Sequence, residues 1–246
     1  MKKFGLIGFP LGHSFSKKYF TEKFEKMGLS DHQYELFEME NANNLMSLWD
    51  DPNLVGLNVT VPHKENVKPF LSKFDHSAEK VGAVNVIKKE KEGLVGYNSD
   101  YYGFKESLLK LIGKRFSVKR SLILGTGGAS KAVKAALTDL GIEYQVVSRS
   151  KEKSELTYDH LKQDSLIFEQ ADLIINSTPL GTFPKVEVCP DLPYQSMHSG
   201  QYLYDLVYNP SVTLFMQKGL DAGAKVKNGL EMLELQAERS WEIWNS

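Results

Sequence analysis

Apolar and polar positions alternate along the first hundred residues in a way that predicts strands and helices in turn. Strand-like apolar runs cover residues 4–9, 34–39 and 54–59, and amphipathic helical patterns cover residues 15–27 and 42–49. This βαβαβ order predicts a mainly parallel sheet with helices on its faces.

Two further apolar runs, at residues 84–88 and 93–96, predict a pair of strands on the same sheet. The charged residues 89–92 between them predict a solvated hairpin tip. A helix is predicted at the end of the chain, where Leu230, Leu233, Ala237, Trp241 and Trp244 follow three- and four-residue spacing.

A second α/β unit is predicted from about residue 102. A strand at residues 121–124 runs into the glycine-rich residues 125–130, and a helical pattern at residues 132–140 ends at Gly141. Further patterns predict strands at 143–147, 173–176 and 201–205 and a helix at 212–220.

Composition narrows the classes of function. The 246 residues include 41% hydrophobic residues, which is ordinary for a globular protein, and 30 basic residues against 31 acidic ones. This balance gives no general attraction to nucleic acid or to an anionic membrane. Cys189 is the only cysteine, which excludes an internal disulfide and fits a reducing compartment. No apolar run approaches the length of a membrane span, so we expect a soluble cytoplasmic protein.

Lys64 is the first candidate for catalysis. The strand at residues 54–59 is followed by Pro62, which cannot donate to a sheet and should leave Lys64 at the rim. A lysine held there suits proton transfer, because its pKa shifts readily. The alternative is an ordinary surface lysine after a strand.

The glycine-rich turn between strand and helix matches a dinucleotide-binding fingerprint. Gly125 permits the tight turn and Gly127 lets the backbone approach a pyrophosphate, while Ser130 stands in place of the third glycine. The alternative is a turn that binds nothing.

The residues after the next strand indicate which nicotinamide cofactor is bound. NAD-binding folds usually place an acidic residue there, whereas this chain has Ser148, Arg149, Ser150 and Lys151. The guanidinium of Arg149 suits a phosphate, so we expect NADP rather than NAD. A solvated loop arginine is the alternative.

Four short runs in order, residues 8–16, 58–64, 82–85 and 96–100, resemble the shikimate dehydrogenase family, and the resemblance extends from Gly8 to Gln236. It implies an α/β protein of two domains with an active-site cleft between them. The N-terminal, mainly parallel domain would bind substrate over residues 1–101, completed by the returning C-terminal helix 230–246. Residues 102–229 would form the Rossmann-type NADP-binding domain.

The resemblance also implies roles for individual residues. Lys64 and Asp100 would be the catalytic pair, with Asp100 orienting the lysine; a surface salt bridge is the alternative. The substrate-binding positions would be Ser14, Ser16, Asn58, Thr60, Asn85, Tyr208 and Gln236. The cofactor-binding positions would be Gly125, Thr126, Gly127, Gly128, Ala129, Ser148, Arg149, Ser150, Ser177, Thr178, Leu206 and Gly229.

Some positions are open to simpler interpretations. Ser14 and Ser16 stand before a predicted helix and could be caps alone. Lys17 replaces the family's usual proline, and Ser99 replaces its usual threonine. No metal site is expected, because His13 and His63 have no spaced partner.

The expected activity is the reversible NADPH-dependent reduction of 3-dehydroshikimate to shikimate, a step in aromatic amino acid biosynthesis. The alternatives are a quinate/shikimate dehydrogenase that uses NAD, and a non-catalytic NADP-binding sensor. The small-molecule substrate and NADP are the expected partners, and the protein would be a monomer or homodimer.

Overall fold

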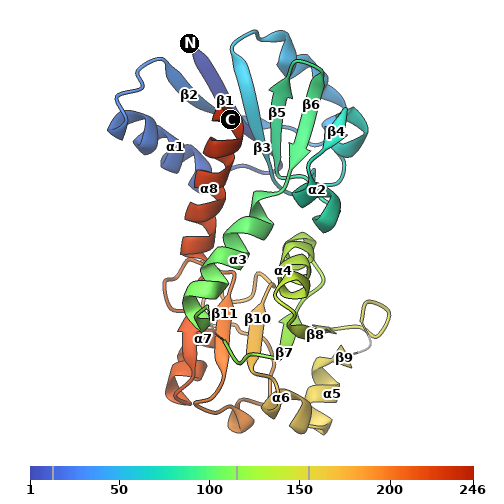
Figure 1. The fold of residues 1–246 in the computed structure, drawn as a ribbon. Helices are drawn as coiled ribbons and strands as arrows, with labels where there is room; N and C mark the ends of the chain where they lie inside the picture. The colour runs from blue at the N-terminus through green and yellow to red at the C-terminus, as the bar shows by residue number, and fades with distance from the viewer. Residues whose placement is uncertain (13, 115, 155) are drawn as a thin grey trace. The chain divides into compact units, whose positions relative to one another are not determined.

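The apolar runs of the first hundred residues form a six-stranded sheet of order β2-β1-β3-β5-β6-β4 (Figure 1). The computed structural model describes residues 1–12, 14–114, 116–154 and 156–246. These divide into two units, residues 1–102 with 235–246 and residues 103–234. Helices α3 (Ser99–Ile112) and α8 (Leu230–Asn245) contribute residues to both units.

The first unit contains strands, two further helices and short 3₁₀ turns. They are β1 (Lys2–Gly8), α1 (Phe15–Lys26), β2 (His32–Glu38), turns at Ala42–Asn44 and Met46–Asp50, β3 (Leu54–Val59), a turn at Lys68–Phe70, β4 (Lys73–Phe74), α2 (His76–Val81), β5 (Val86–Glu90) and β6 (Gly93–Tyr97).

The directions of the strands in this sheet bring several strand ends together at one edge. Strand β1 pairs in parallel with β2 and β3, whereas β5 runs antiparallel to β3 and β6. The carboxyl ends of β1, β3 and β6 therefore meet the amino end of β5. The residues just beyond these ends are the ones that the sequence motifs single out.

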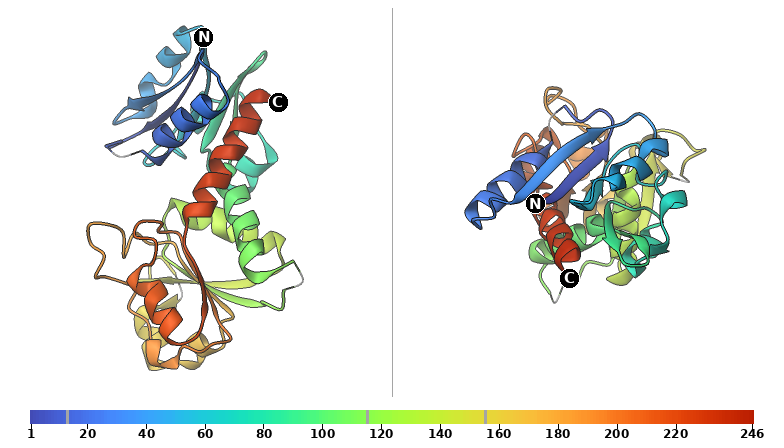
Figure 2. Two further views of the ribbon diagram at one scale, coloured as in Figure 1. Left: turned by 90° about the vertical axis from the view of Figure 1, so that its left-hand side faces the viewer. Right: turned by 90° about the horizontal axis from the view of Figure 1, so that it is seen from above.

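The last helix packs on one face of this sheet. The rings of Phe4 and Trp244 lie 4.9 Å apart, and the indole Nε1 of Trp244 donates to the Ile87 carbonyl at 3.1 Å. Gly56 makes room for the indole, since a Cβ there would lie 2.2 Å from it. Helix α1 lies beside α8 on the same face (Figure 2), joined by the ion pair of Lys23 with Glu238 at 2.7 Å.

The second unit has an all-parallel sheet of order β12-β11-β10-β7-β8-β9 with helices around it. Its elements are β7 (Arg120–Leu124), α4 (Gly128–Asp139), β8 (Glu143–Ser148), β9 (Leu156–Thr157), α5 (Tyr158–Gln163), α6 (Leu166–Glu169), β10 (Leu173–Asn176), a 3₁₀ turn at Tyr194–Ser196, β11 (Tyr202–Asp205), α7 (Leu214–Asp221) and β12 (Lys225–Lys227). Its core includes Leu122, Ile174, Leu203 and Phe215. This is a doubly wound α/β arrangement, as the glycine-rich turn predicts.

Two local expectations are wrong. Residues 42–49 form two 3₁₀ turns instead of an α-helix, because Leu45 and Leu48 donate to carbonyls only three residues back and Asn43-Asn44 are weak helix formers. The hairpin tip is also shorter than residues 89–92. Strand β5 continues to Glu90, which pairs with Gly93. The backbone φ of Gly93 is 129°.

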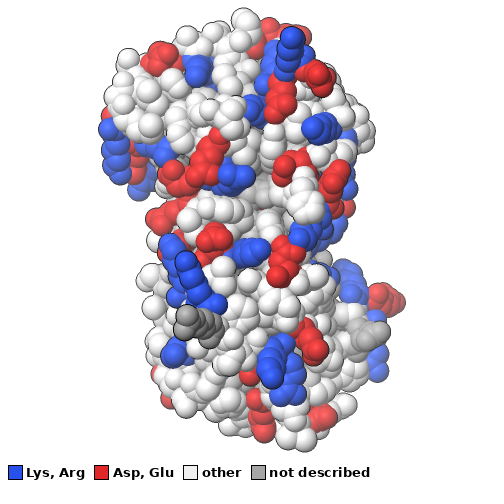
Figure 3. Space-filling view, viewed as in Figure 1, with Lys and Arg blue, Asp and Glu red and all other residues white. Residues whose placement is uncertain are grey.

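Charged side chains of both signs are interspersed over the face shown in Figure 3. None of the helices in the described parts of the chain is long and apolar enough to cross a membrane.

Candidate active site

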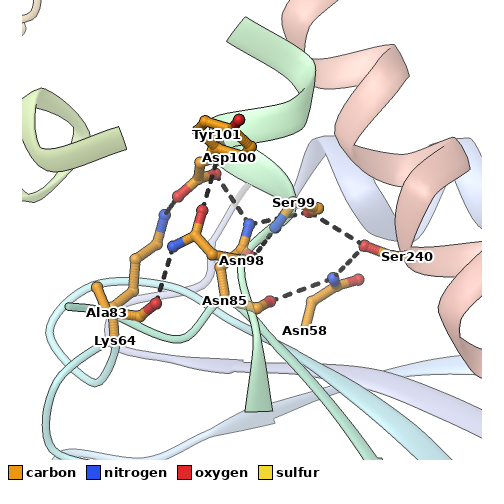
Figure 4. A network of polar contacts seen from close by, with 9 residues as sticks. All are labelled: Asn58, Lys64, Ala83, Asn85, Asn98, Ser99, Asp100, Tyr101 and Ser240. Carbon is orange, nitrogen blue, oxygen red and sulfur yellow. Dashed lines mark hydrogen bonds and ion pairs between the residues drawn. The ribbon is translucent and has the colours of Figure 1, made fainter. Parts of the chain in front are cut away.

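Lys64 and Asp100 form an ion pair at the carboxyl edge of the first sheet (Figure 4). The Nζ atom of Lys64 lies 2.5 Å from Oδ2 of Asp100, and their side chains are 21% and 7% exposed. The carboxylate is therefore buried while the lysine reaches the surface.

The backbone around Lys64 is fixed by hydrogen bonds. The carbonyl of Lys64 accepts from Val84 N at 2.8 Å, which ties the turn after β3 to the segment before β5. The neighbouring His63 is fully buried, and its Nε2 lies 2.6 Å from the Met39 carbonyl. Lys64 therefore projects from an anchored turn.

Asn85 holds the carboxylate on its other side. Its Nδ2 donates to Oδ1 of Asp100 at 2.9 Å and to Oγ of Ser99 at 3.0 Å, and its Oδ1 accepts from Ser99 N at 2.6 Å. Asn98 accepts from Tyr101 N at 3.1 Å and so caps α3. Asp100 lies in the first turn of that helix, where the dipole favours negative charge.

Asn58 belongs to a neighbouring buried network. Its Oδ1 accepts from the Tyr34 hydroxyl at 2.7 Å, and its Nδ2 donates to Ser240 Oγ at 2.8 Å (Figure 4). Burial raises the pKa of Tyr34 far above its ordinary value, although a hydrogen bond with Ser16 opposes the shift. Sequence reasoning missed Tyr34 and Ser240, because an ordinary core tyrosine and a helical serine carry no motif.

Two of the other expected substrate residues of this unit, Ser14 and Thr60, lie at element ends, and Gln236 lies within a helix. Ser14 caps α1 by accepting from Lys17 N at 3.2 Å, a bond that the family's usual proline could not make. Thr60 follows β3 and donates its N–H to the Ile7 carbonyl at 2.9 Å. Gln236 lies in α8, and its carbonyl accepts from Ser240 Oγ at 2.9 Å.

This arrangement can supply a proton donor beside a fixed carboxylate. Within the described residues no group of three metal-ligating side chains occurs. His63 is engaged with the Met39 carbonyl, and His13 lies outside the described residues.

The second unit contains a pocket of about 590 Å³ at the carboxyl edge of its sheet. Its lining includes the residues expected at a dinucleotide site, namely Gly125, Thr126, Gly127, Ser148, Arg149, Ser150, Ser177 and Thr178. Lys153, Tyr158, Pro179 and Leu180 line it as well. Sequence reasoning missed Lys153 and Tyr158. Lys153 could have been found, because a second cation four residues after Arg149 is another candidate for binding the same anion.

The glycine turn leaves space for a ligand. Gly125 has a φ of 103°, which favours glycine, while a Cβ at Gly127 or Gly128 would meet nothing within 4 Å. Gly128 and Ala129 open helix α4, and Ser130 donates its hydroxyl to the Gly127 carbonyl at 2.6 Å. Ser130 thus ties the first turn of α4 to the residue that precedes the helix.

Among the described residues, the two cations of the pocket have no carboxylate partner. Arg149 and Lys153 make no ion pair with another described residue, and Ser148 and Ser150 brace the turn that carries Arg149. An anion would therefore meet uncompensated positive charge there.

Two loops of the second unit are tied together beside this pocket. Oδ1 of Asp205 accepts from Asn176 Nδ2 at 2.9 Å, and Asn176 in turn accepts from Thr178 Oγ1 at 2.6 Å. Ser177 Oγ donates to the Leu124 carbonyl at 2.7 Å. These bonds hold the loop after β10 at the pocket wall.

The three remaining expected residues follow β11 or precede α8. Gly229 donates to the Val207 carbonyl at 3.1 Å, and a Cβ at Gly229 would lie 2.2 Å from the Leu206 carbonyl oxygen. The structure therefore brings Leu206 and Gly229 together, outside the lining of the 590 Å³ pocket. Tyr208 is exposed on the same loop.

Known proteins are similar to this chain in sequence and in fold. A family model described as the shikimate dehydrogenase substrate binding domain matches residues 6–87. A shikimate dehydrogenase (NADP(+)) of Methanococcus maripaludis is 36% identical, with 99% of this chain and 91% of that protein covered.

Two solved structures extend the likeness. A chorismate mutase/shikimate 5-dehydrogenase fusion protein of Clostridium acetobutylicum is 38% identical with a TM-score of 0.87, covering 100% of this chain and 91% of that one. Shikimate 5-dehydrogenase of Thermus thermophilus, in complex with NADP(H) and shikimate, is 29% identical with a TM-score of 0.82, covering 99% and 93%. With a relative above 30% identity over almost its whole length, this chain belongs to the shikimate dehydrogenase family.

Proposed function

We propose that this protein catalyses the reversible NADPH-dependent reduction of 3-dehydroshikimate to shikimate. The observation that carries the proposal is the Lys64–Asp100 ion pair, held by Asn85 at the carboxyl edge of the first sheet. Membership of the family supports the substrate and the cofactor.

Lys64 is the proton donor in this proposal. Bound NADPH supplies the hydride that adds to the ketone carbon. The ketone oxygen then carries developing negative charge, which the Lys64 ammonium stabilises before it transfers its proton to that oxygen. In shikimate oxidation Lys64 takes the same proton back, so the step balances in both directions.

Asp100 keeps Lys64 oriented. Its carboxylate is held by Asn85, so the direction of the Lys64–Asp100 bond is set by the sheet edge. In this proposal Asp100 also accepts a hydrogen bond from the substrate hydroxyl. A sensor that only binds NADP would need neither partner of this pair.

Hydroxyls and amides of the first unit would hold the substrate carboxylate and hydroxyls. In this proposal Ser14 and Ser16 bind the carboxylate at the start of α1, where the helix dipole favours an anion. Thr60, Asn85 and Gln236 bind hydroxyls. Asn58 completes the set in the first unit, and Tyr208 of the second unit is the remaining proposed substrate residue.

The pocket of the second unit fits NADP. The open positions at Gly127 and Gly128 leave room for a pyrophosphate at the start of α4. The guanidinium of Arg149, which no described carboxylate pairs, suits the 2′-phosphate. Lys153 adds a second cation. The remaining proposed cofactor positions are Gly125, Thr126, Ala129, Ser148, Ser150, Ser177, Thr178, Leu206 and Gly229.

One assay tests this function. The purified protein is incubated with shikimate or quinate, each with NADP or NAD, and the absorbance of the reduced nicotinamide is followed. We expect the highest kcat/KM for shikimate with NADP. Faster turnover of quinate with NAD would assign the alternative dehydrogenase activity, and no turnover with any pair would leave a binding protein.

A cytoplasmic monomer or homodimer is part of the proposal. The unpaired Cys189 fits a reducing compartment. Sedimentation at several protein concentrations distinguishes monomer from dimer, and cell fractionation tests the location.

A further inference from the structure

A tyrosine without an assigned role lines the pocket beside Arg149. Tyr158 is the first residue of α5 and directly follows the two-residue strand β9. The connection from β8 to β9 spans residues 149–155, and its described part, 149–154, contains turns and no helix. This short connection leaves Tyr158 in the same pocket wall as Arg149 and Lys153.

The Tyr158 hydroxyl makes no hydrogen bond to another described residue. Two other tyrosines of this unit do satisfy theirs: Tyr194 donates to the Pro190 carbonyl at 2.7 Å and Tyr204 to Ser107 Oγ at 2.8 Å. Tyr158 is half-buried, and its O–H is used by no described residue, so the hydroxyl is available to a ligand in the pocket.

The hydroxyl remains a donor at every physiological pH. Burial raises the pKa of Tyr158 to about 12, although the positive charge of Arg149 acts in the opposite direction. The guanidinium of Arg149 and the phenol of Tyr158 line the same pocket, where one ligand group can meet both. Asp191 also acts on Tyr158, but its carboxylate is paired with Lys162.

Within the described part of the chain, this end of the pocket therefore presents two cations without a carboxylate partner and one O–H donor without an acceptor. A phosphate monoester carries about two negative charges and three strong acceptor oxygens, which matches that set. The adenine and ribose hydroxyls of NAD offer no such anion.

We propose that the Tyr158 hydroxyl donates a hydrogen bond to the 2′-phosphate of NADP and so contributes to the preference for NADP over NAD. This inference rests on the proposed function, because it takes the pocket to be the cofactor site. It makes Tyr158 a specificity-determining residue alongside Arg149.

The test measures binding of two small probes that differ only in the 2′-phosphate, 2′,5′-ADP and 5′-AMP, by calorimetry. Tyr158→Phe removes one oxygen and keeps the ring on the core. We expect the Kd of 2′,5′-ADP to rise roughly tenfold, the scale of one hydrogen bond to a charged group, and that of 5′-AMP to stay within about twofold. Tyr144→Phe, on the distal part of β8, is the matched control and should change neither Kd.

Equal losses for both probes would overturn the inference, since the tyrosine would then serve only as a wall for adenosine. An unchanged Kd for 2′,5′-ADP would overturn it as well. Combining Tyr158→Phe with Arg149→Ala should give less than the sum of the two losses in binding free energy, because both groups contact one phosphate.

Neither probe contains nicotinamide and neither assay needs shikimate. A protein that fails to oxidise shikimate but shows the Tyr158 effect would refute the proposed function and keep the phosphate site. A protein that oxidises shikimate with NADP but shows no Tyr158 effect would refute this inference alone.

Discussion

At the scale of single residues, the Lys64–Asp100 pair is arranged for chemistry more than for stability. A partly buried ion pair pays for the desolvation of both charges, and replacement by apolar residues often stabilises a protein. The Asp100 carboxylate nevertheless has two hydrogen-bonding partners, Lys64 and Asn85, while Lys64 stays 21% exposed. An accessible ammonium can reach a substrate oxygen, and a fixed carboxylate keeps that ammonium oriented toward it.

Lys64→Ala should lower kcat for shikimate roughly 10²- to 10⁴-fold, the usual effect of losing a general acid or base. The Kd for NADPH should be unchanged, because Lys64 lies outside the cofactor pocket. Steady-state kinetics and fluorescence titration check the two values. Lys73→Ala, which removes an exposed lysine of the same unit, should have neither effect.

Near-normal turnover in Lys64→Ala would remove this lysine from the mechanism. Asp100→Asn distinguishes an orienting role from a structural one, since we expect it to impair kcat while the variant stays folded. A variant that loses its folded circular dichroism instead would make the pair a structural salt bridge.

Arg149→Ala should weaken NADP binding by about 1.5 to 3 kcal/mol and leave NAD binding nearly unchanged. The reason is that only NADP carries the phosphate which the unpaired guanidinium would meet. Raised salt should weaken NADP binding in the wild type too, because an exposed ion contact is screened over about 8 to 10 Å. Fluorescence titration of both cofactors measures this.

Lys151→Ala is the matched control, since Lys151 is exposed on the same turn but does not line the pocket. It should leave both cofactor affinities close to wild type. Equal losses of NADP and NAD in Arg149→Ala would mean that the residue supports the turn or stacks on adenine.

At the scale of elements, Asp205 joins the ends of three of them. It accepts from Asn176 at the end of β10, from Val207 after β11 and from Thr213 at the start of α7, the last at 2.6 Å. Burial nevertheless raises the pKa of Asp205 to about 6. The ionised form of Asp205 is therefore less stable in the folded protein than in the unfolded chain.

The sign of the pH dependence follows from that raised pKa. Between the ordinary value of 3.8 and about 6, the native state binds more protons than the unfolded state, so this residue makes stability fall as the pH rises. Asp205→Asn can keep the same partners without the charge. We expect it to gain up to about 3 kcal/mol in free energy of unfolding at about pH 7, and little at about pH 4.

Urea unfolding at the two pH values checks this gain, with Asp159→Asn, an exposed carboxylate of α5, as the control that should show none. A loss of stability in Asp205→Asn at neutral pH would mean that the three hydrogen bonds outweigh the cost of burial.

Elements with strong periodicity were predictable from the sequence, and short ones were not. Strand β3 occupies the predicted residues 54–59, and α8 follows the spacing of its apolar residues. Strands β4 and β9 are two residues long and give no period, so the sequence analysis missed them. Helix α3 was missed because its start coincides with a motif that was interpreted for chemistry alone.

The candidate site was predictable only as far as motifs reach. The contact between Lys64 and Asp100, 36 residues apart, was expected from two motifs and is present, while their roles stay predictions. Packing of the first unit brings Tyr34 and Ser240 to Asn58. The short connection from β8 to β9 brings Lys153 and Tyr158 into the pocket of the second unit. Such tertiary placement leaves no local pattern in a single sequence.

At the scale of the whole molecule, the chain has separate hydrophobic cores in its two units, and all three tryptophans lie in the first. Trp49 belongs to one face of the first sheet, and Trp241 and Trp244 belong to the other. The second unit has a core of its own. Tryptophan fluorescence therefore reports unfolding of the first unit, whereas calorimetry follows both.

NADP should thus separate two thermal transitions. At about one hundred times its Kd, a ligand that binds only the native state adds about 2.7 kcal/mol of stability to the part that it binds. We expect NADP to raise the calorimetric transition of the second unit and to leave the tryptophan fluorescence transition in place. Shikimate is the converse control, because it should raise the fluorescence transition. Helices α3 and α8 contribute to both units, so an equal rise of the two transitions with NADP would show that these helices make the chain unfold as one cooperative structure.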